Sequence, residues 1–165
     1  MLEKLEINCQ NISQYAKFLF NILADNMYKI STTNNSRDED FQIWFENLQE
    51  RLLNEKCFVI AFLHYGNVIG YLQYSISENT LMIEEVEISP KFLIRYNILG
   101  NVIKILSEIS SENITYVEAY ANKNNKISMQ ILRKAGFQIV GTNKNKTSYL
   151  HKTTFSELVK RFKLS

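Results

Sequence analysis

The sequence predicts a mixed α/β (α+β) fold, in which helices flank a sheet that is mostly antiparallel but contains one parallel pair of strands. The segments with strand and helix patterns follow one another in the order β-α-α-β-β-β-α-β-α-β-β-α. Turn sequences between neighbouring strands indicate hairpins. A helical segment separates two other strands, residues 81–89 and 114–121, and such a β-α-β unit is expected to be parallel and right-handed.

The first third of the chain predicts a strand, a helix, a loop and a second helix, at residues 2–8, 11–27, 28–40 and 41–54. Both helical segments carry apolar residues at helical spacing, whereas the loop is polar and rich in turn formers. The acidic run at residues 38–40 suits the positive end of the second helix. We prefer this explanation of the acidic run to a role in substrate recognition.

The middle of the chain predicts three strands, at residues 56–65, 68–76 and 81–89. Gly66 and Asn67 give a tight hairpin signal between the first two. Pro90, the only proline, closes the third strand because it cannot donate to a ladder. A helix at about residues 100–110 and a strand at residues 114–121 follow.

The last part of the chain predicts a short helix, a closing hairpin at residues 138–141 and 147–152, and a final helix from Thr154. Either Asn124 or Asn125 can cap the short helix. Ile127, Ile131 and Ala135 recur on one side of it and predict a buried stripe. Gly136 suits the left-handed residue that ends a helix.

Composition excludes several classes of function. The 165 residues predict one domain, spanning 1–165, and a net charge of +2 without a long basic run does not indicate a nucleic-acid partner. The longest apolar run, residues 57–63, is too short to span a bilayer, and the N-terminus lacks a signal-peptide core. We therefore expect no membrane association and a cytoplasmic location.

The few cysteines and histidines exclude other chemistry. Cys9 and Cys57 are far apart in the sequence and predict reduced, structural thiols. His64 and His151 are the only histidines and lack metal-ligand spacing, so we expect no metal. Neither a GxxxxGK[ST] phosphate loop nor a GxGxxG fingerprint is present.

Four segments follow one another in a fixed order: the hairpin CFVIAFLHYGNVIGYLQYSI, the strand IEEVEISP, the loop RYNILG and the block VEAYANKNNKISMQILRKAGF. Together they resemble the GNAT superfamily of acyl-CoA-dependent N-acetyltransferases. The resemblance covers about residues 56–141. The last block is most similar to the branch that contains ribosomal-protein N-terminal acetyltransferases. The resemblance implies a central parallel pair of strands that splay apart, with acetyl-CoA as co-substrate.

The resemblance also implies which residues bind the cofactor. The loop at residues 95–100 would wrap the pyrophosphate with main-chain amides. The third strand would pair with the pantetheine arm, Asn125 would contact that arm or a bound water, and Ser128 would lie near the sulfur as a catalytic candidate. The cofactor-binding residues implied are Val86, Glu87, Ile88, Arg95, Tyr96, Asn97, Ile98, Leu99, Gly100, Asn101, Asn125 and Ser128.

The chain departs from the family pattern at two positions. Ile98 stands where the loop usually has its first glycine, and a β-branched side chain restricts positive φ. Leu132 stands where much of the superfamily has a tyrosine that acts as general acid. That role would pass to Ser128, to a water, or to Tyr120 or Tyr149, unless the thiolate leaves without help.

An amine that binds as ammonium needs a base, and the sequence offers Glu84, Glu85, Glu87 and Glu118. Alternation places Glu85 and Glu87 on one face of their strand and Glu84 on the other. We favour Glu85 as the catalytic base, although each acid singly is more often a solvated or salt-bridged carboxylate. His151, on the closing hairpin, is expected to be a surface residue rather than a base.

The predicted reaction is transfer of an acetyl group from acetyl-CoA to a primary amine by direct attack in a ternary complex. The amine could be a protein N-terminus, an aminosugar or a polyamine, and the loops at 28–40 and 141–147 would select it. The alternative is a catalytically silent CoA-binding or interaction module of the same fold. Edge strands and the last helix allow for a homodimer.

Overall fold

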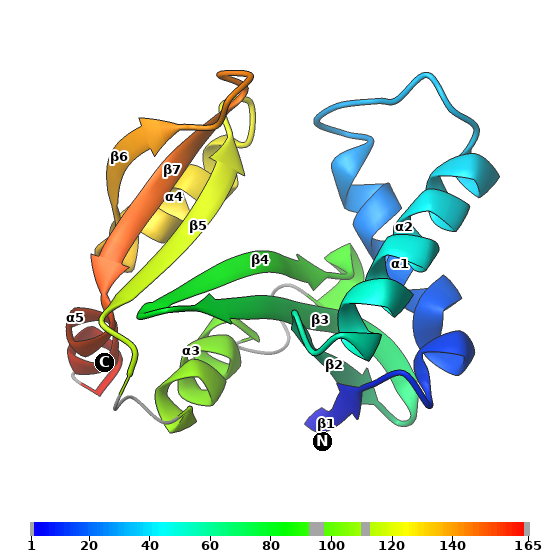
Figure 1. Ribbon diagram of the computed structural model, residues 1–165, viewed down its shortest axis with the longest axis horizontal. Helices are drawn as coiled ribbons and strands as arrows, with labels where there is room; N and C mark the ends of the chain where they lie inside the picture. The colour runs from blue at the N-terminus through cyan, green and yellow to red at the C-terminus, as the bar shows by residue number, and fades with distance from the viewer. Residues whose placement is uncertain (1, 93–97, 110–112, 164–165) are drawn as a thin grey trace. The chain divides into compact units, whose positions relative to one another are not determined.

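The computed structural model describes residues 2–92, 98–109 and 113–163. Its strands and helices follow the predicted order (Figure 1). The helices are α1 (Ile12–Met27), α2 (Arg37–Leu53), α3 (Ile98–Glu108), α4 (Lys126–Lys134) and α5 (Phe155–Lys163). The strands are β1 (Leu2–Ile7), β2 (Phe58–His64), β3 (Asn67–Ser77), β4 (Thr80–Ile88), β5 (Tyr116–Asn122), β6 (Gln138–Thr142) and β7 (Ser148–Thr154).

The predicted fold class is confirmed. The strands form a seven-stranded sheet in the order β1-β2-β3-β4-β5-β7-β6. The described register is antiparallel between β1 and β2, β2 and β3, β5 and β7, and β6 and β7. The predicted parallel pair is β4 and β5, where residues 80–83 align with residues 116–119.

The boundaries of two helices differ from the prediction. Helix α2 begins at Arg37, so the loop ends earlier than residue 40. Ser36 caps this helix, because its hydroxyl accepts from the Glu39 N–H while the Glu39 carboxylate accepts from the Ser36 N–H. The capping box is visible in the sequence, but the polar acidic run was included in the predicted loop. The predicted helix therefore began several residues too late. Helix α3 begins at Ile98 rather than near Gly100.

The chain divides into two compact units. The first takes described residues 2–75 and 85–92, and the second takes 76–84, 98–109 and 113–163. Strand β4 contributes to both, its last residues to the first unit and its first residues to the second.

In the first unit, α1 and α2 pack on one face of β1, β2 and β3 (Figure 1). The amphipathic pattern predicted for residues 11–27 buries one face of α1 in this core. The Phe20 ring lies against two aromatic rings of α2, 5.3 Å from Phe41 and 5.6 Å from Trp44 between centroids. These contacts fix the two helices to each other and so set the position of the connection between them.

The hairpin between β2 and β3 turns one residue earlier than predicted. Its two turn residues are Tyr65 and Gly66, with φ of 49° and 76°, and Asn67 already pairs with His64. A turn with positive φ at both central residues matches the twist of a hairpin.

In the second unit, α4 ends as predicted, but its apolar side chains do not form a buried stripe. Gly136 has a φ of 94°, and its N–H and that of Phe137 bond to the carbonyls of Arg133 and Leu132, which completes a Schellman motif. Ile127, however, is 72% exposed and Ile131 is 38% exposed. The spacing predicted the helix correctly, while burial depends on neighbouring elements that the spacing does not contain.

Candidate active site

Two glutamates of β4 lie together on one face of the strand, as alternation predicted. The side chains of Glu85 and Glu87, here called the acidic pair, are within hydrogen-bonding reach of each other. The Glu87 carboxylate also accepts a hydrogen bond of 2.8 Å from the Asn26 side-chain amide on α1. The same amide donates to the Ile88 carbonyl at 3.1 Å, so Asn26 fastens the end of β4 to α1.

Burial changes the ionisation of the acidic pair. It raises the pKa of Glu87, because a partly buried carboxylate loses hydration, and the hydrogen bonds from Asn26 and Glu85 offset part of this rise. The acidic pair therefore includes a carboxyl group with an elevated proton affinity, which is what a general base for an amine requires.

Tyr71, which the sequence did not indicate as a site residue, lies near enough to the acidic pair to feel its charge. Tyr71 on β3 is fully buried, and within the described chain its hydroxyl is the one buried side-chain oxygen or nitrogen without a hydrogen-bond partner. Burial, followed by the charges of Glu85 and Glu87, raises its pKa well above the usual value, so the hydroxyl stays protonated. Its strand pattern is that of an ordinary core residue, so nothing in the sequence distinguishes it from one.

Gly70 allows the backbones of β3 and β4 to approach closely at the acidic pair. A Cβ atom on Gly70 would lie 2.6 Å from the Glu87 carbonyl oxygen, closer than non-bonded atoms approach. The Ser89 N–H donates to the Ile69 carbonyl at 2.8 Å, directly beside this contact. Any side chain at Gly70 would push Glu87 away from its present position.

A pocket of about 560 Å³ opens where β4 ends, and we call it the β4-end pocket. One wall is the end of α1 with the turn that follows it, and the other is the segment after β4, which forms a 3₁₀ turn at Pro90–Phe92. The residues that line it are Asp25, Lys29, Ser89, Pro90, Lys91 and Phe92. Asp25 lies next to Asn26, so this pocket and the acidic pair share the junction of α1 with β4.

The connection between α1 and α2, predicted to select the substrate, is held by one carboxylate. Asp40 accepts hydrogen bonds from the Tyr28 hydroxyl at 2.6 Å and the Thr33 hydroxyl at 2.6 Å. It also accepts one from the Asn35 amide at 3.2 Å. These bonds lower the pKa of Asp40, that from Thr33 most, and the bond to Asp40 raises the pKa of Tyr28. The acidic run thus has a structural role beyond the helix dipole.

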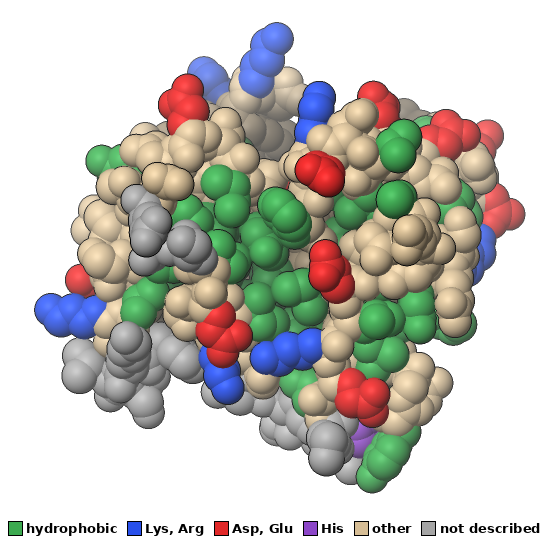
Figure 2. Space-filling view, turned by 60° about the horizontal axis from the view of Figure 1, so that its bottom comes forward, with side chains coloured by type: hydrophobic (Ala, Val, Ile, Leu, Met, Phe, Trp, Pro, Cys, Tyr) green, Lys and Arg blue, Asp and Glu red, His purple; other side chains and the backbone are tan. Residues whose placement is uncertain are grey.

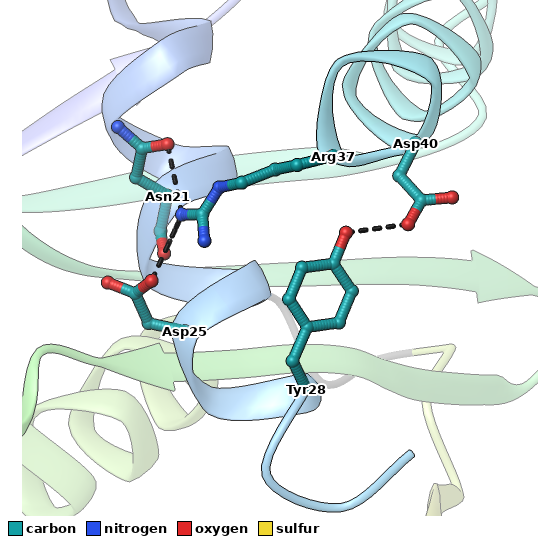
Figure 3. A network of polar contacts seen from close by, with 5 residues as sticks. All are labelled: Asn21, Asp25, Tyr28, Arg37 and Asp40. Carbon is teal, nitrogen blue, oxygen red and sulfur yellow. Dashed lines mark hydrogen bonds and ion pairs between the residues drawn. The ribbon is translucent and has the colours of Figure 1, made fainter. Parts of the chain in front are cut away.

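A second group of contacts ties the start of α2 back to α1 (Figure 3). The Arg37 guanidinium is 3.0 Å from the Asp25 carboxylate and also donates to the side-chain and main-chain oxygens of Asn21, at 3.2 and 3.4 Å. Figure 3 shows Tyr28 reaching from the end of α1 to Asp40 beside this group. The connection is therefore anchored at both ends.

The implied pyrophosphate loop is only partly described. Arg95, Tyr96 and Asn97 lie outside the described residues. Ile98, Leu99, Gly100 and Asn101 form the first turn of α3 rather than a loop. Helical φ is negative and open to β-branched residues, so the isoleucine in place of glycine at position 98 fits its backbone. The first turn is also the positive end of the helix, which suits a phosphate.

At α4 the structure decides between the two asparagines. Asn125 is the N-cap, and its side-chain oxygen accepts from the Ser128 N–H at 3.1 Å. Ser128 itself lies on the first turn and is half-buried. The local role of Asn125 is thus the capping role, and contacts of Asn125 and Ser128 with pantetheine stay predictions. The same holds for main-chain pairing at Val86 and Ile88 and for the splaying of the strand pair.

The base candidate Glu118 and the histidine His151 both have structural explanations. Glu118 pairs across the strands with Lys152, 3.4 Å away, and the Lys152 ammonium also lies 4.0 Å from the centre of the Tyr116 ring. His151 was expected at the surface, but it is only 2% exposed, and its Nδ1 lies 3.1 Å from the Tyr149 carbonyl. It is opposite Ala119 in the register, on a buried face of β7 that a short hairpin pattern did not distinguish.

The described residues contain no disulfide, membrane-spanning helix or cluster of metal ligands. Cys9 and Cys57 are both free thiols. In the ranges that the structure describes, no helix is long and apolar enough to cross a membrane, and no cluster of metal-ligating side chains occurs. On the face in Figure 2, the coloured acidic and basic side chains are interspersed rather than gathered by sign.

No family model and no curated protein matches the sequence. Solved structures do match the fold. PaiA N-acetyltransferase from Thermoplasma acidophilum, in complex with coenzyme A, aligns with a TM-score of 0.73, covering 93% of this chain and 99% of that one at 11% identity. An acetyltransferase of the GNAT family from Streptococcus pneumoniae gives 0.62, with 93% and 99% covered at 14% identity.

Mutant forms of the spermidine/spermine N-acetyltransferase SpeG from Vibrio cholerae give a TM-score of 0.64, covering 98% of this chain and 99% of that one at 11% identity. At such low identities the similarity is one of fold. This chain has the fold of the GNAT acetyltransferases, and the resemblance stated from its sequence is confirmed at that level.

Proposed function

We propose that the protein is an acetyl-CoA-dependent N-acetyltransferase that acts on a primary amine. The observation that carries the proposal is the acidic pair, in which a partly buried glutamate with a raised pKa lies beside a second carboxyl group on β4. In an N-acetyltransferase, a carboxylate with a raised pKa on that strand could take a proton from the amine more readily than a solvated carboxylate could. Perturbed carboxyl groups of this kind mark functional sites more often than surfaces.

The acidic pair would remove a proton from the acceptor. A primary amine binds as ammonium and must lose one proton before its lone pair can attack. We assign the base to Glu85 and Glu87 together, since the proton would be shared between their oxygens. Asn26 would hold the Glu87 carboxylate in position, and Tyr71 would keep the space behind the pair closed to water.

Acetyl-CoA would supply a thioester whose carbonyl carbon forms the new C–N bond as the C–S bond breaks and the thiolate leaves. The first proton of the ammonium group would go to the acidic pair before attack. The second, which the nitrogen still carries in the tetrahedral intermediate, would go to the departing sulfur or to water as the C–S bond breaks. For binding, we retain the residues that the sequence implied: the first turn of α3, the segment before it from Arg95, the main chain of Val86 to Ile88, and Asn125 with Ser128. Leu132 offers no hydroxyl for the thiolate, so the leaving group would depart as the anion or be protonated by another residue.

The test is release of free CoA from acetyl-CoA in the presence of a panel of primary amines. We expect Glu87→Gln and Glu85→Gln each to lower kcat by about 10²- to 10⁴-fold, the usual contribution of a positioned base. Glu118→Gln is the matched control, because that glutamate already pairs with Lys152. It should keep its kcat within a fewfold.

The same assay separates the enzyme from a catalytically silent module. Thermal stabilisation by acetyl-CoA with no turnover on any amine would favour the silent module, for which Leu132 is the supporting residue. The absence of both stabilisation and turnover would refute both readings. Equal losses in Glu118→Gln and Glu87→Gln would refute the assignment of the base.

A further inference from the structure

The β4-end pocket has two lysines in its lining. Lys29 and Lys91 line it from opposite walls, and both are exposed. Neither has an ion-pair partner in the described part of the chain. The one carboxylate in the lining, that of Asp25, already pairs with Arg37 at 3.0 Å. The lining thus includes two lysines that have no ion pair among the described residues, together with Ser89.

The pocket lies close to the acidic pair along the same strand. Ser89 follows Glu87 by two residues, and its N–H continues the ladder to the Ile69 carbonyl, so the chain is still extended there. In an extended chain, residues two apart project from the same face about 7 Å from each other. Asn26 bonds to Glu87 and to the Ile88 carbonyl, and its chain neighbour Asp25 lines the pocket, so both places lie where the end of α1 meets the end of β4.

We propose that the β4-end pocket binds an anionic group, a carboxylate or a phosphate, on the acceptor molecule. This inference rests on the proposed function and narrows its substrate class. The acceptor is a small primary amine with an anionic group a few bonds from the nitrogen. Its ammonium faces the acidic pair while its anion faces Lys29 and Lys91.

The charges argue against a polyamine. A second ammonium on the acceptor would lie against Lys29 and Lys91, and like charges repel where opposite charges would attract. SpeG, which shares the fold, is named for the polyamines spermidine and spermine, whose further amino groups are cationic rather than anionic. The two lysines are therefore a feature by which this chain would differ in substrate from such a neighbour.

The test measures binding first, without acetyl-CoA, by isothermal titration calorimetry. The probes are O-phosphoethanolamine and β-alanine, each compared with ethanolamine, which lacks the anion. The variant is the double substitution Lys29→Gln with Lys91→Gln. Its control is Lys4→Gln with Lys56→Gln, which removes the same charge from exposed positions outside the pocket. Circular dichroism checks that both variants are folded.

We expect the wild type and the control to bind O-phosphoethanolamine at least tenfold more tightly than ethanolamine. Because an exposed ion pair is worth up to about a fivefold change in affinity, the Lys29/Lys91 variant should lose about tenfold or more for the phosphate. A stronger preference for O-phosphoethanolamine than for β-alanine identifies a phosphate site. The reverse preference identifies a carboxylate site.

The proposal is overturned if the wild type binds neither anionic probe more tightly than ethanolamine, or if both double variants lose affinity equally. Acetyl transfer is then measured on the same compounds and on spermidine. Tight, lysine-dependent binding without transfer would refute the proposed function and leave the anion site standing. Transfer that is fastest with spermidine would refute the anion site and leave the proposed function standing.

Discussion

Replacing Tyr71 by phenylalanine should stabilise the protein. The Tyr71 hydroxyl is fully buried and has no hydrogen-bond partner among the described residues. A buried polar group without a partner costs about 1–3 kcal/mol of folding free energy, because it gives up its bonds to water. Removal of the oxygen also leaves a small void, whose lining loses some dispersion contacts. We therefore expect a net gain of about 1 kcal/mol.

For a chain of this length, a gain of about 1 kcal/mol corresponds to a rise in Tm of roughly 2–4 °C. Differential scanning calorimetry and urea denaturation both measure it. Tyr28→Phe is the matched control, because the same atom is removed from a hydroxyl that donates to Asp40 at 2.6 Å. That variant should have a lower Tm than the wild type. The same change of tyrosine to phenylalanine would then raise Tm at position 71 and lower it at position 28.

A fall in Tm of more than about 2 °C in Tyr71→Phe would refute this reasoning. It would mean that the hydroxyl is bonded in solution, either to the acidic pair or to a trapped water, and that its loss strands that partner. A crystal structure of the wild type would then show which of the two is present.

Three further predictions concern the residues around the acidic pair. Burial raises the pKa of Glu87 in the folded protein above its ordinary value of 4.5. Protonated Glu87 therefore stabilises the folded state fully below pH 4.5, and this stabilisation is lost as the pH rises through the raised pKa. Urea denaturation from pH 4 to 8 should show that loss in the wild type and not in Glu87→Gln. Asn26→Ala should raise the pKa of Glu87 further and move the acid limb of the kcat/KM profile upward, since the hydrogen bond that favours the carboxylate is gone. Gly70→Ala should cost about 1–3 kcal/mol in denaturation and also lower kcat, because the new Cβ displaces the Glu87 main chain.

Each of these has an outcome that contradicts it. Parallel stability curves for the wild type and Glu87→Gln would show that the pKa of Glu87 is the same in the folded and unfolded states. An unchanged acid limb in Asn26→Ala would show that the amide does not act on the ionising group. If Gly70→Ala lost stability and kept its kcat, the close approach of the strands would be structural only.

The order of elements was predictable because each depends on local periodicity. The stripe of α1 and the hairpin after β2 follow from spacing within short windows, and the parallel pair of β4 and β5 follows from the order strand, helix, strand. The pairing of Glu85 with Glu87 was predictable for the same reason, since two residues on one strand alternate in a fixed way.

What the sequence did not reveal depends on contacts between distant segments. Asn26 and Glu87 are 61 positions apart, and nothing in either pattern indicates their hydrogen bond. The burial of His151 and the exposure of Ile127 are decided by which elements cover them. The family pattern has glycine at position 98, which suggested a loop that isoleucine would fit poorly. The structure has α3 beginning there, and a helical backbone accepts isoleucine.

The dependence of the segment between α1 and α2 on Asp40 has a consequence for protein engineering. Tyr28, Thr33 and Asn35 all rely on a single acceptor in the first turn of α2, so these side chains would be released together by a change at that one position. A replacement segment grafted from another protein of this fold would need to bring its own donors for Asp40. If the proposed function holds, this segment could then be exchanged to change the acceptor while α2 is left unchanged.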